Sequence, residues 1–410
     1  MIAWLDLSHE RRQQLLTAVS IRTQLPEYAI EKDWWVTLAL KAAFSTPWAD
    51  YLVFKGGTSL SKAWNLIERF SEDIDLALDR TVLGFAGELS KGDVKRLRRK
   101  ASEFMSDTFR KDLEQALLDM GLLPEQFQLL VRPTDQPDLD PRVLELHYHS
   151  VVTPDPYIEN RVLIEIGARS LREPCSPRNI VSIIGATLSG QPFSDFPFPV
   201  QTVDPQRTFL EKAFLLHETF YAVPIRKEPN RLTRHLYDLE KLMDTPHAEA
   251  ALANRELYTS IVLHREKLTA VRGIEYDRHS PDKIDFIPPW DVLSAWESDY
   301  TAMKQMIHGP SLPFSELVAK LKELRWRFRK SQPTTLPPEI TIADVVAKAR
   351  ERVLEQGNVR DGSFVTMLVY YNQDIMQPES DRNVDHQYKV SFFVSDGRLI
   401  LDDLVPVPAH

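Results

Sequence analysis

The segment that most constrains the fold is LVFKGGTSLSKAWNLIERFSEDIDLAL, residues 52–78. Two glycines, Gly56 and Gly57, separate an apolar run from a segment of helical composition, and an alternating pattern with two aspartates follows. Side chains two apart on a strand point the same way, so Asp73 and Asp75 share a face with Cα atoms about 6.6–6.8 Å apart. Two carboxylates this close repel each other unless cations lie beside them. The segment therefore predicts a strand, a glycine turn, a helix and a second strand with a cation-binding face.

The glycine turn complements that acidic face. Gly56 and Gly57 let the backbone approach a ligand closely, and Thr58 and Ser59 begin a helix whose N-terminal amides can hold phosphate. The turn is not a Walker A loop, because Lys62 does not follow a glycine. Hard divalent ions prefer oxygen ligands, keep phosphate oxygens as partners, activate an attacking hydroxyl and stabilise a leaving pyrophosphate. The pattern indicates phosphoryl chemistry that depends on Mg²⁺, with Mn²⁺ as the alternative ion.

Length and composition limit the class of protein. With 410 residues, 43% of them apolar, the chain can bury a substantial core, and its length favours more than one domain. The sequence has no apolar run of about eighteen residues and no basic start followed by an apolar stretch, so neither a transmembrane helix nor a secretory signal is expected. The single cysteine, Cys175, excludes an intramolecular disulfide and a cysteine-rich zinc site. We expect a cytoplasmic protein with no membrane partner.

The net charge of −9 repels nucleic acid at long range, so contact with RNA or DNA requires a local basic surface. Two stretches are basic enough: KGDVKRLRRK at residues 91–100, and KLKELRWRFRK at residues 320–330, where Trp326 and Phe328 are interleaved. Charge runs are more often solvated helix faces than binding sites. Both interpretations stay open for both stretches.

The order of the predicted elements indicates an α+β protein. Ser8 suits an N-cap, and Pro26 suits the first turn of a second helix. After the glycine turn we expect a helix over residues 58–69, a strand at EDIDLAL and a basic helix over about 93–120. Three strand patterns then precede helices that begin near residue 205: FQLLVR, RVLELHYHSV and NRVLIEIGAR. This order predicts a mixed sheet followed by a helical second lobe.

The C-terminal part of the sequence has the pattern of a small additional domain. SQPTTLPPE, residues 331–339, has the composition of a linker. An amphipathic helix and several strands follow, and the Asp-Gly pair within residues 395–398 is a hairpin signal. We therefore expect a core over residues 1–204, a helical lobe over 205–330 and a small α+β domain over 340–410.

Taken together, the Gly-Gly turn and the Asp-x-Asp strand resemble the signature of DNA-polymerase-β-like nucleotidyltransferases. FKGGTSLSKAW…RFSEDIDLAL is similar to one branch, the AbiEii-type toxins of abortive-infection (phage-defence) and toxin–antitoxin systems. The EKD element at residues 31–33 and the segments FLEKAFLLHE and RHLYDLEKL extend this resemblance over roughly residues 25–245. The resemblance implies a polymerase-β-like catalytic core with a nucleoside triphosphate as substrate.

The resemblance also implies roles for individual residues. Asp73 and Asp75, with Glu165 as a third ligand, would bind the metal, and the catalytic residues would be Asp73, Asp75, Lys212 and Asp238. The nucleotide-binding residues would be Gly56, Gly57, Thr58, Ser59, Lys62, Ser71 and Lys212. The resemblance does not fix a role for Lys32 and Asp33. We expect them, with Arg234, to support the residues that contact the substrate, and a helix-packing corner is the alternative for Lys32 and Asp33.

Several of these residues also have a purely structural interpretation. Glu165 would then be a surface side chain on an edge strand. Lys212 lies beside the apolar stripe of its helix, where an ammonium either extends to water or meets an anion. Asp238 either forms an exposed ion pair with Arg234 or orients a nucleotide or Lys212. Many relatives have Arg-Asp-x-x-Asp at this point, and His235, which replaces the first aspartate, is expected to be packed rather than to act as a base.

The activity that the resemblance implies is transfer of a nucleoside monophosphate from a triphosphate to RNA, particularly a tRNA 3′ end. Growth arrest would follow unless a cognate antitoxin intervenes. Ser71 would contact the nucleotide, or would receive a phosphate or nucleotide group that disables the site. The alternatives are transfer to a protein hydroxyl or a small molecule, and a binding module without catalysis.

Overall fold

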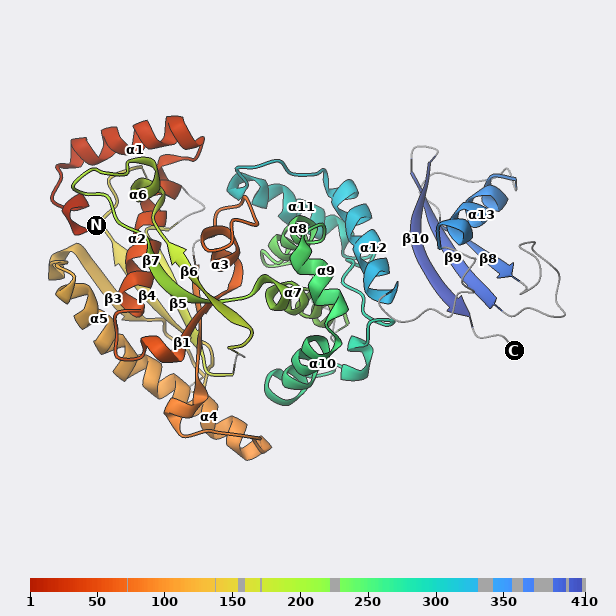
Figure 1. The fold of residues 1–410 in the computed structure, drawn as a ribbon, viewed down its shortest axis with the longest axis horizontal. Helices are drawn as coiled ribbons and strands as arrows, with labels where there is room; N and C mark the ends of the chain where they lie inside the picture. Colours follow the sequence, from red (N-terminus) through yellow and green to blue (C-terminus); the bar gives the residue numbers. More distant parts are fainter. Residues whose placement is uncertain are drawn as a thin grey trace. The chain divides into compact units, whose positions relative to one another are not determined.

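The computed structural model describes residues 1–71, 73–136, 138–153, 159–169, 172–221, 229–330, 342–355, 364–371, 386–395 and 398–407 (Figure 1). Over this part of the chain the fold is α+β, as expected. The chain divides into two compact units. The first comprises Met1–Glu211, Thr259–Ala270 and Met303–Ser311, and the second comprises Lys212–Tyr258, Val271–Ala302 and Leu312–His410.

The first unit begins with two helices, α1 (His9–Thr23) and α2 (Glu27–Ala43). Ser8 caps α1 as expected, because its Oγ accepts a hydrogen bond of 3.2 Å from the Arg11 amide. Pro26 is the residue that immediately precedes α2. Nearly all of α2 is buried, including Glu31, Lys32 and Asp33, so it is a core helix rather than an amphipathic surface helix.

A mixed sheet of seven strands forms the centre of this unit (Figure 1). Its order is β3 (Phe127–Val131), β4 (Arg142–Tyr148), β5 (Arg161–Gly167), β2 (Asp73–Leu78), β1 (Leu52–Lys55), β7 (Phe198–Val203) and β6 (Cys175–Ile180). The β2–β5 and β1–β7 pairs are parallel, and the other neighbours are antiparallel. The sequence did not indicate β6 and β7, because both contain a proline and neither alternates cleanly. An edge position accommodates Pro177 in β6.

Among the described residues, four further α-helices lie wholly in the first unit: α3 (Gly56–Lys62), α4 (Lys91–Phe104), α5 (Arg110–Asp119) and α6 (Ile183–Thr187). A short π-helical turn, Met105–Phe109, joins α4 to α5, so the basic helix is confirmed. The expected helix over residues 58–69 is wrong beyond Lys62. The chain turns there, since Asn65 adopts a φ of 52° and Trp64 Nε1 donates to the Val203 carbonyl at 3.1 Å.

The two faces of the sheet differ. On one face, Ile74, Leu76 and Leu78 of β2 are buried in the main core, where α2 and α5 pack on the strands and α1 packs on α2. The opposite face of β2 carries Asp73 and Asp75, which are only half-buried. The alternation expected for this strand is therefore confirmed, and the acidic side chains lie away from the main core.

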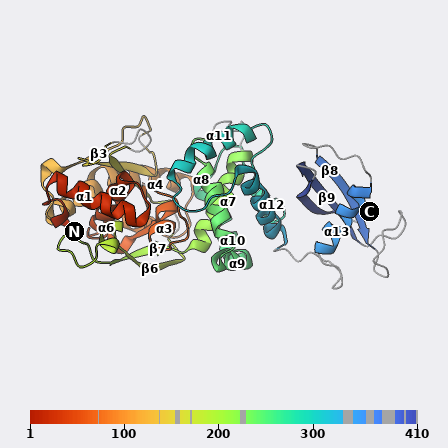
Figure 2. The ribbon, with the colours of Figure 1, turned by 90° about the horizontal axis from the view of Figure 1, so that it is seen from above.

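The helices from α7 onward are α7 (Pro205–Tyr221), α8 (Thr233–Leu242), α9 (Pro246–Ala253), α10 (Arg255–His264), α11 (Leu293–Met303) and α12 (Phe314–Lys330). The C-terminal elements are α13 (Ile342–Glu355), β8 (Phe364–Tyr371), β9 (His386–Ser395) and β10 (Arg398–Val407). Figure 2 shows α13 beside the antiparallel sheet of order β10-β9-β8. Val345, Ala349 and Val353 pack there against Val390 and Phe392.

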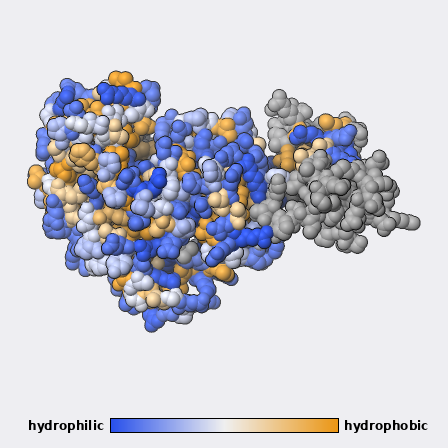
Figure 3. All heavy atoms as spheres, in the orientation of Figure 1, coloured by the Kyte–Doolittle hydropathy of each residue, from blue (hydrophilic) through white to orange (hydrophobic). Residues whose placement is uncertain are grey.

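The C-terminal hairpin is confirmed by its register, because Arg398 pairs with Ser395. Residues 396–397 and the linker expected at 331–339 lie outside the described residues. Among the described residues, no helix is both long enough and apolar enough to cross a membrane. Hydrophilic and hydrophobic residues are interspersed over the face shown in Figure 3.

Candidate functional site

Three carboxylates share one face of the central sheet. β2 runs parallel to β5 with Asp75 directly opposite Glu165, and Asp73 lies opposite Leu163. Side chains at paired positions point to the same face, so Asp73, Asp75 and Glu165 face the same way. β5 lies between β4 and β2, so the edge-strand interpretation of Glu165 is wrong. Lys55 of β1 is also opposite Asp75, which adds a cation to the same face.

The glycine turn packs directly against this acidic face. Gly56 has a φ of +79°, a conformation that L side chains rarely adopt, and a Cβ built there would overlap Asp75 Oδ2. A Cβ on Gly57 would lie 2.6 Å from Arg69 Nη2 and 3.1 Å from Ser71 Oγ. Gly56 is therefore required by its backbone conformation and by the close approach of Asp75, while Gly57 leaves room for the ends of the Arg69 and Ser71 side chains.

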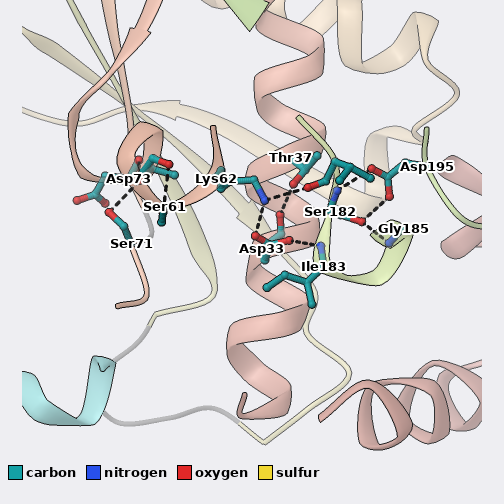
Figure 4. Close-up of polar contacts among 12 residues, drawn as sticks. Asp33, Thr37, Ser61, Lys62, Ser71, Asp73, Ser182, Ile183, Gly185 and Asp195 are labelled. Atoms are coloured by element: carbon teal, nitrogen blue, oxygen red, sulfur yellow. Dashed lines mark hydrogen bonds and ion pairs between the residues drawn. The ribbon is translucent and has the colours of Figure 1, made fainter. Parts of the chain in front are cut away.

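The hydroxyl groups near the turn connect α3 to β2. Thr58 Oγ1 hydrogen-bonds the Asp73 carbonyl and lies 2.9 Å from Ser71 Oγ, with which it also shares a hydrogen bond. Ser59 Oγ donates to the Gly56 carbonyl at 2.9 Å. Thr58 and Ser59 are fully buried. Their hydroxyls therefore hold the turn together, and Ser71, which the sequence placed on the exposed side, is half-buried next to Asp73 (Figure 4).

The EKD element anchors three other segments. Lys62 and Asp33 point toward each other from α3 and α2 and form an ion pair, and Asp33 Oδ2 also accepts from the Ile183 amide at 2.7 Å (Figure 4). Lys32 Nζ donates to the Glu159 carbonyl at 3.0 Å. Glu31 accepts from the Val151 amide at 2.9 Å, and burial raises the pKa of its carboxyl. The element supports the core from behind, and Lys62 is engaged with Asp33.

In the second unit, Lys212 of α7 meets an anion. Its Nζ lies 2.8 Å from Asp238 Oδ2 of α8 and 3.3 Å from His235 Nδ1. Asp238 is fully buried, so the interpretation of Asp238 as part of an exposed ion pair with Arg234 is wrong. Arg234 is half-buried on the same helix. His235 is also half-buried, and its contact with Lys212 was not expected for a histidine packed on the apolar side.

Asp73, Asp75 and Glu165 offer carboxylate oxygens on one face of β2 and β5, which is the ligand type that Mg²⁺ prefers. Within the described ranges, no group of three or more His, Cys, Asp or Glu side chains is placed so that it could hold a metal ion by itself. Protein sites for Mg²⁺ often use one or two carboxylates together with substrate phosphates. The two aspartates, with Glu165 beside Asp75, match that kind of site.

Arg69 is a residue that the sequence did not single out. It is 3% exposed, and its guanidinium lies against Gly57 and near Ser71. The expected helix over 58–69 would have placed it at a helix end. Its backbone pairs with a chain segment more than two hundred residues away, residues 306–309, so no local pattern signalled this position.

The two basic stretches differ. On α12, Lys322 pairs with Asp402 at 2.8 Å, Arg325 with Asp285 at 2.7 Å and Arg327 with Asp244 at 2.8 Å. Phe328 is fully buried. Three cations of this stretch are therefore engaged by acids of the second unit, while Lys320 remains exposed. The cations of α4 remain largely exposed and pair mainly with acids of their own helix.

A sequence model of the family described as "Nucleotidyl transferase AbiEii toxin, Type IV TA system" matches residues 38–330. The match covers well over half of the 410 residues and includes the glycine turn, the acidic face and the Lys212–Asp238 pair. It begins after the EKD element. Comparison with curated proteins gives no match.

Proposed function

Because the chain belongs to the AbiEii family of nucleotidyltransferase toxins of type IV toxin–antitoxin systems, we propose that it transfers a nucleoside monophosphate from a nucleoside triphosphate to RNA. The acceptor in this proposal is the 3′ end of a tRNA, and the consequence is growth arrest that a cognate antitoxin prevents. The reaction requires Mg²⁺, with Mn²⁺ as the alternative.

The observation that carries this proposal is the arrangement of three carboxylates against a glycine turn. Asp75 is opposite Glu165 on the neighbouring strand and touches the space left by Gly56, while Asp73 lies two residues before it on the same face. A turn without side chains admits a triphosphate close to the backbone. Oxygen ligands at its edge suit the ion that accompanies a triphosphate.

In the proposed reaction, an acceptor hydroxyl oxygen bonds to the α-phosphorus while the bond from that phosphorus to its bridging oxygen breaks. Pyrophosphate leaves with that electron pair, and the hydroxyl proton passes to water. Asp73, Asp75 and Glu165 would hold the metal, which when bound supplies charge neutralisation and orientation. The rigid connection from Thr58 to the Asp73 carbonyl fixes the turn relative to the acidic strand.

Lys212 would balance negative charge on the triphosphate, and Asp238 would orient its ammonium group. The buried pair with Nζ and Oδ2 2.8 Å apart supports the orienting role. A lysine held in this way has fewer rotamers to lose when it meets a second anion.

The experiment that tests the proposal is incubation of the purified full chain with Mg²⁺ and each α-labelled nucleoside triphosphate. Total RNA is the acceptor in one set of reactions and total cell protein in another, and labelled RNA is sequenced. We expect label at RNA 3′ ends, concentrated on tRNA, from one or a few of the triphosphates. The Asp73→Asn variant, assayed in parallel, is expected to transfer no label.

Each alternative has its own outcome. Label on protein and none on RNA would replace the RNA acceptor by a protein hydroxyl. Label recovered only in a soluble product, when a metabolite extract is supplied, would indicate a small-molecule acceptor. No transfer to any acceptor, with no binding of triphosphate, would leave a binding module without catalysis.

A further inference from the structure

A buried arginine occupies the back of the glycine turn. Arg69 is 3% exposed, and its Nη2 lies 2.6 Å from the position that a Cβ on Gly57 would take. Ser71 Oγ is 3.1 Å from the same position. The guanidinium therefore fills the space that a side chain at residue 57 would need, next to the proposed seat of the triphosphate.

The chemistry of this group suits phosphate. An arginine guanidinium stays protonated in proteins, and its planar set of N–H donors matches phosphate oxygens in pairs. Arg69 Nη1 donates to the Phe70 carbonyl at 3.4 Å, which helps to orient the guanidinium. Charge-assisted hydrogen bonds to phosphate are strong at this depth, because water screens them little.

A distant segment fixes the backbone around Arg69. Phe70 donates its amide to the Met306 carbonyl at 2.7 Å, Arg69 and Ile307 form an antiparallel β-bridge, and the His308 amide donates to the Glu68 carbonyl at 3.0 Å. We name residues 306–309 the strap. Phe70 and Met306 also pack with Ala29 of α2 in a small apolar cluster, which ties the strap to the core.

One position of the strap, Gly309, leaves no room for a side chain. A Cβ on Gly309 would overlap Glu68, both at its carboxylate and at its Cβ. Gly309 is only half-buried and lies three residues along the strap from Met306, which contacts Phe70, so it is distinct from the glycine turn. A substitution there should displace the strap while leaving every proposed phosphate ligand unsubstituted.

We propose that Arg69 binds the triphosphate at the glycine turn and that the strap sets the orientation of its guanidinium. Arg69 would be a binding residue, and the strap residues would be positioning residues. This inference rests on the proposed nucleotidyl transfer, and it adds a cationic ligand to the acidic and glycine-rich parts of the site.

The test is titration of the full chain with Mg²⁺ and tripolyphosphate, with each nucleoside triphosphate and with the corresponding monophosphates. Arg69→Gln should weaken tripolyphosphate binding by about 10–100-fold, the equivalent of one charge-assisted hydrogen-bond pair. Arg69→Lys should restore part of the affinity, because it keeps the charge but not the planar donors. Monophosphate affinity should change less, which a general loss of structure would not produce.

Gly309→Ala should weaken triphosphate binding in the same direction, and Gly92→Ala on α4, where an added Cβ meets only Ser90 Oγ at 3.7 Å, is the matched control. Thermal unfolding of each variant reports its fold. If Arg69→Gln does not fold, Arg69→Lys and Gly309→Ala decide the question. Wild-type affinity in Arg69→Gln overturns the role of Arg69, and wild-type affinity in Gly309→Ala overturns the role of the strap. Failure of the wild-type chain to bind any of these phosphates would instead contradict the proposed function.

Discussion

Lys62 of α3 and Asp33 of α2 form a buried ion pair, in which the Asp33 carboxylate also accepts the Ile183 amide. Their side chains are 8% and 7% exposed. The pair fastens the helix that begins with the glycine turn to the core helix behind it. A lysine that the sequence suggested as a phosphate ligand therefore has a structural partner inside the protein.

Removing one partner of this pair should be costly. Asp33→Ala leaves the Lys62 ammonium buried, and breaking a buried pair in this way typically lowers the free energy of unfolding by about 3–5 kcal/mol. Asp33→Ala combined with Lys62→Met should regain part of that loss, because no charge is then left buried. Urea denaturation of Asp33→Ala, of Lys62→Met and of the double variant measures the coupling free energy between the two side chains. Additive losses would show that the two side chains do not depend on each other.

Gly56 should tolerate no side chain. Gly56→Ala places an L residue at a φ of +79°, which costs about 1–2 kcal/mol, and its Cβ would displace the Asp75 carboxylate. We expect transfer activity to fall by about 100-fold or more, as for other losses of preorganised charge. Gly92→Ala is the control, and it should leave activity unchanged and raise stability slightly. Near-normal transfer by Gly56→Ala would mean that Asp75 can move without consequence.

The sequence predicted those parts of the site whose structure depends on neighbouring residues in the chain. The alternation around Asp73 and Asp75 and the glycine turn before them were visible, because strand periodicity and steric freedom depend on neighbouring residues. The partner of Lys62 lies 29 residues away, and the strap pairs with the Arg69 backbone from more than two hundred residues further along the chain. Pairings of this kind follow from tertiary packing, which a single sequence does not display.

The same reasoning explains the strands that were missed. β6 and β7 pair with each other and with β1 through backbone hydrogen bonds, which do not depend on an apolar pattern. Their prolines, Pro177 and Pro199, reduce the strand signal. Only the assembled sheet supplies the partners that make them strands.

Neutralising one carboxylate of the acidic face should lower the transfer activity without lowering the stability of the fold. Asp73→Asn keeps the size of the side chain but removes the charge that a metal ion needs, so transfer should fall by about 10²–10³-fold or more. Stability should be unchanged or higher, because the repulsion between Asp73 and Asp75 is relieved. Glu165→Gln should act in the same direction. Transfer rates over a range of Mg²⁺ concentrations, with denaturation curves for each protein, measure both effects. An unaltered rate in Asp73→Asn would contradict the assignment of Asp73 as a metal ligand.

Two histidines, the buried His217 and the half-buried His264, should make stability fall in mild acid. Burial lowers the pKa of His217 to about 4, helped by the neighbouring His279, and burial with the nearby Arg207 lowers the pKa of His264 to about 4. Both side chains would be protonated near the ordinary value of 6.5 in the unfolded chain. The unfolded state therefore binds more protons between about pH 6.5 and pH 4, so stability is lost as pH falls through that window.

Denaturation at several pH values checks this expectation. His217→Asn keeps an acceptor for the Asp285 amide, which bonds His217 Nδ1 at 3.1 Å, but cannot be protonated. The variant should lose less stability than the wild-type chain between pH 6.5 and pH 4. Equal losses in the two proteins would show that His217 does not contribute to the acid sensitivity.

The basic residues of α12 should stabilise the second unit without contacting RNA. Arg325 bonds Asp285 at 2.7 Å and also donates to the Asp402 carbonyl, so it joins α12 to a loop and to β10. Arg325→Gln removes charge-assisted hydrogen bonds of a kind worth about 1.5–3 kcal/mol in stability. RNA affinity, measured as a function of salt, should keep the wild-type slope, since no phosphate contact is lost. Lys95→Gln on α4 is the comparison, because that side chain is exposed and its loss should leave stability unchanged. A reduced salt slope in Arg325→Gln, with normal stability, would show that α12 presents its charge to RNA after all.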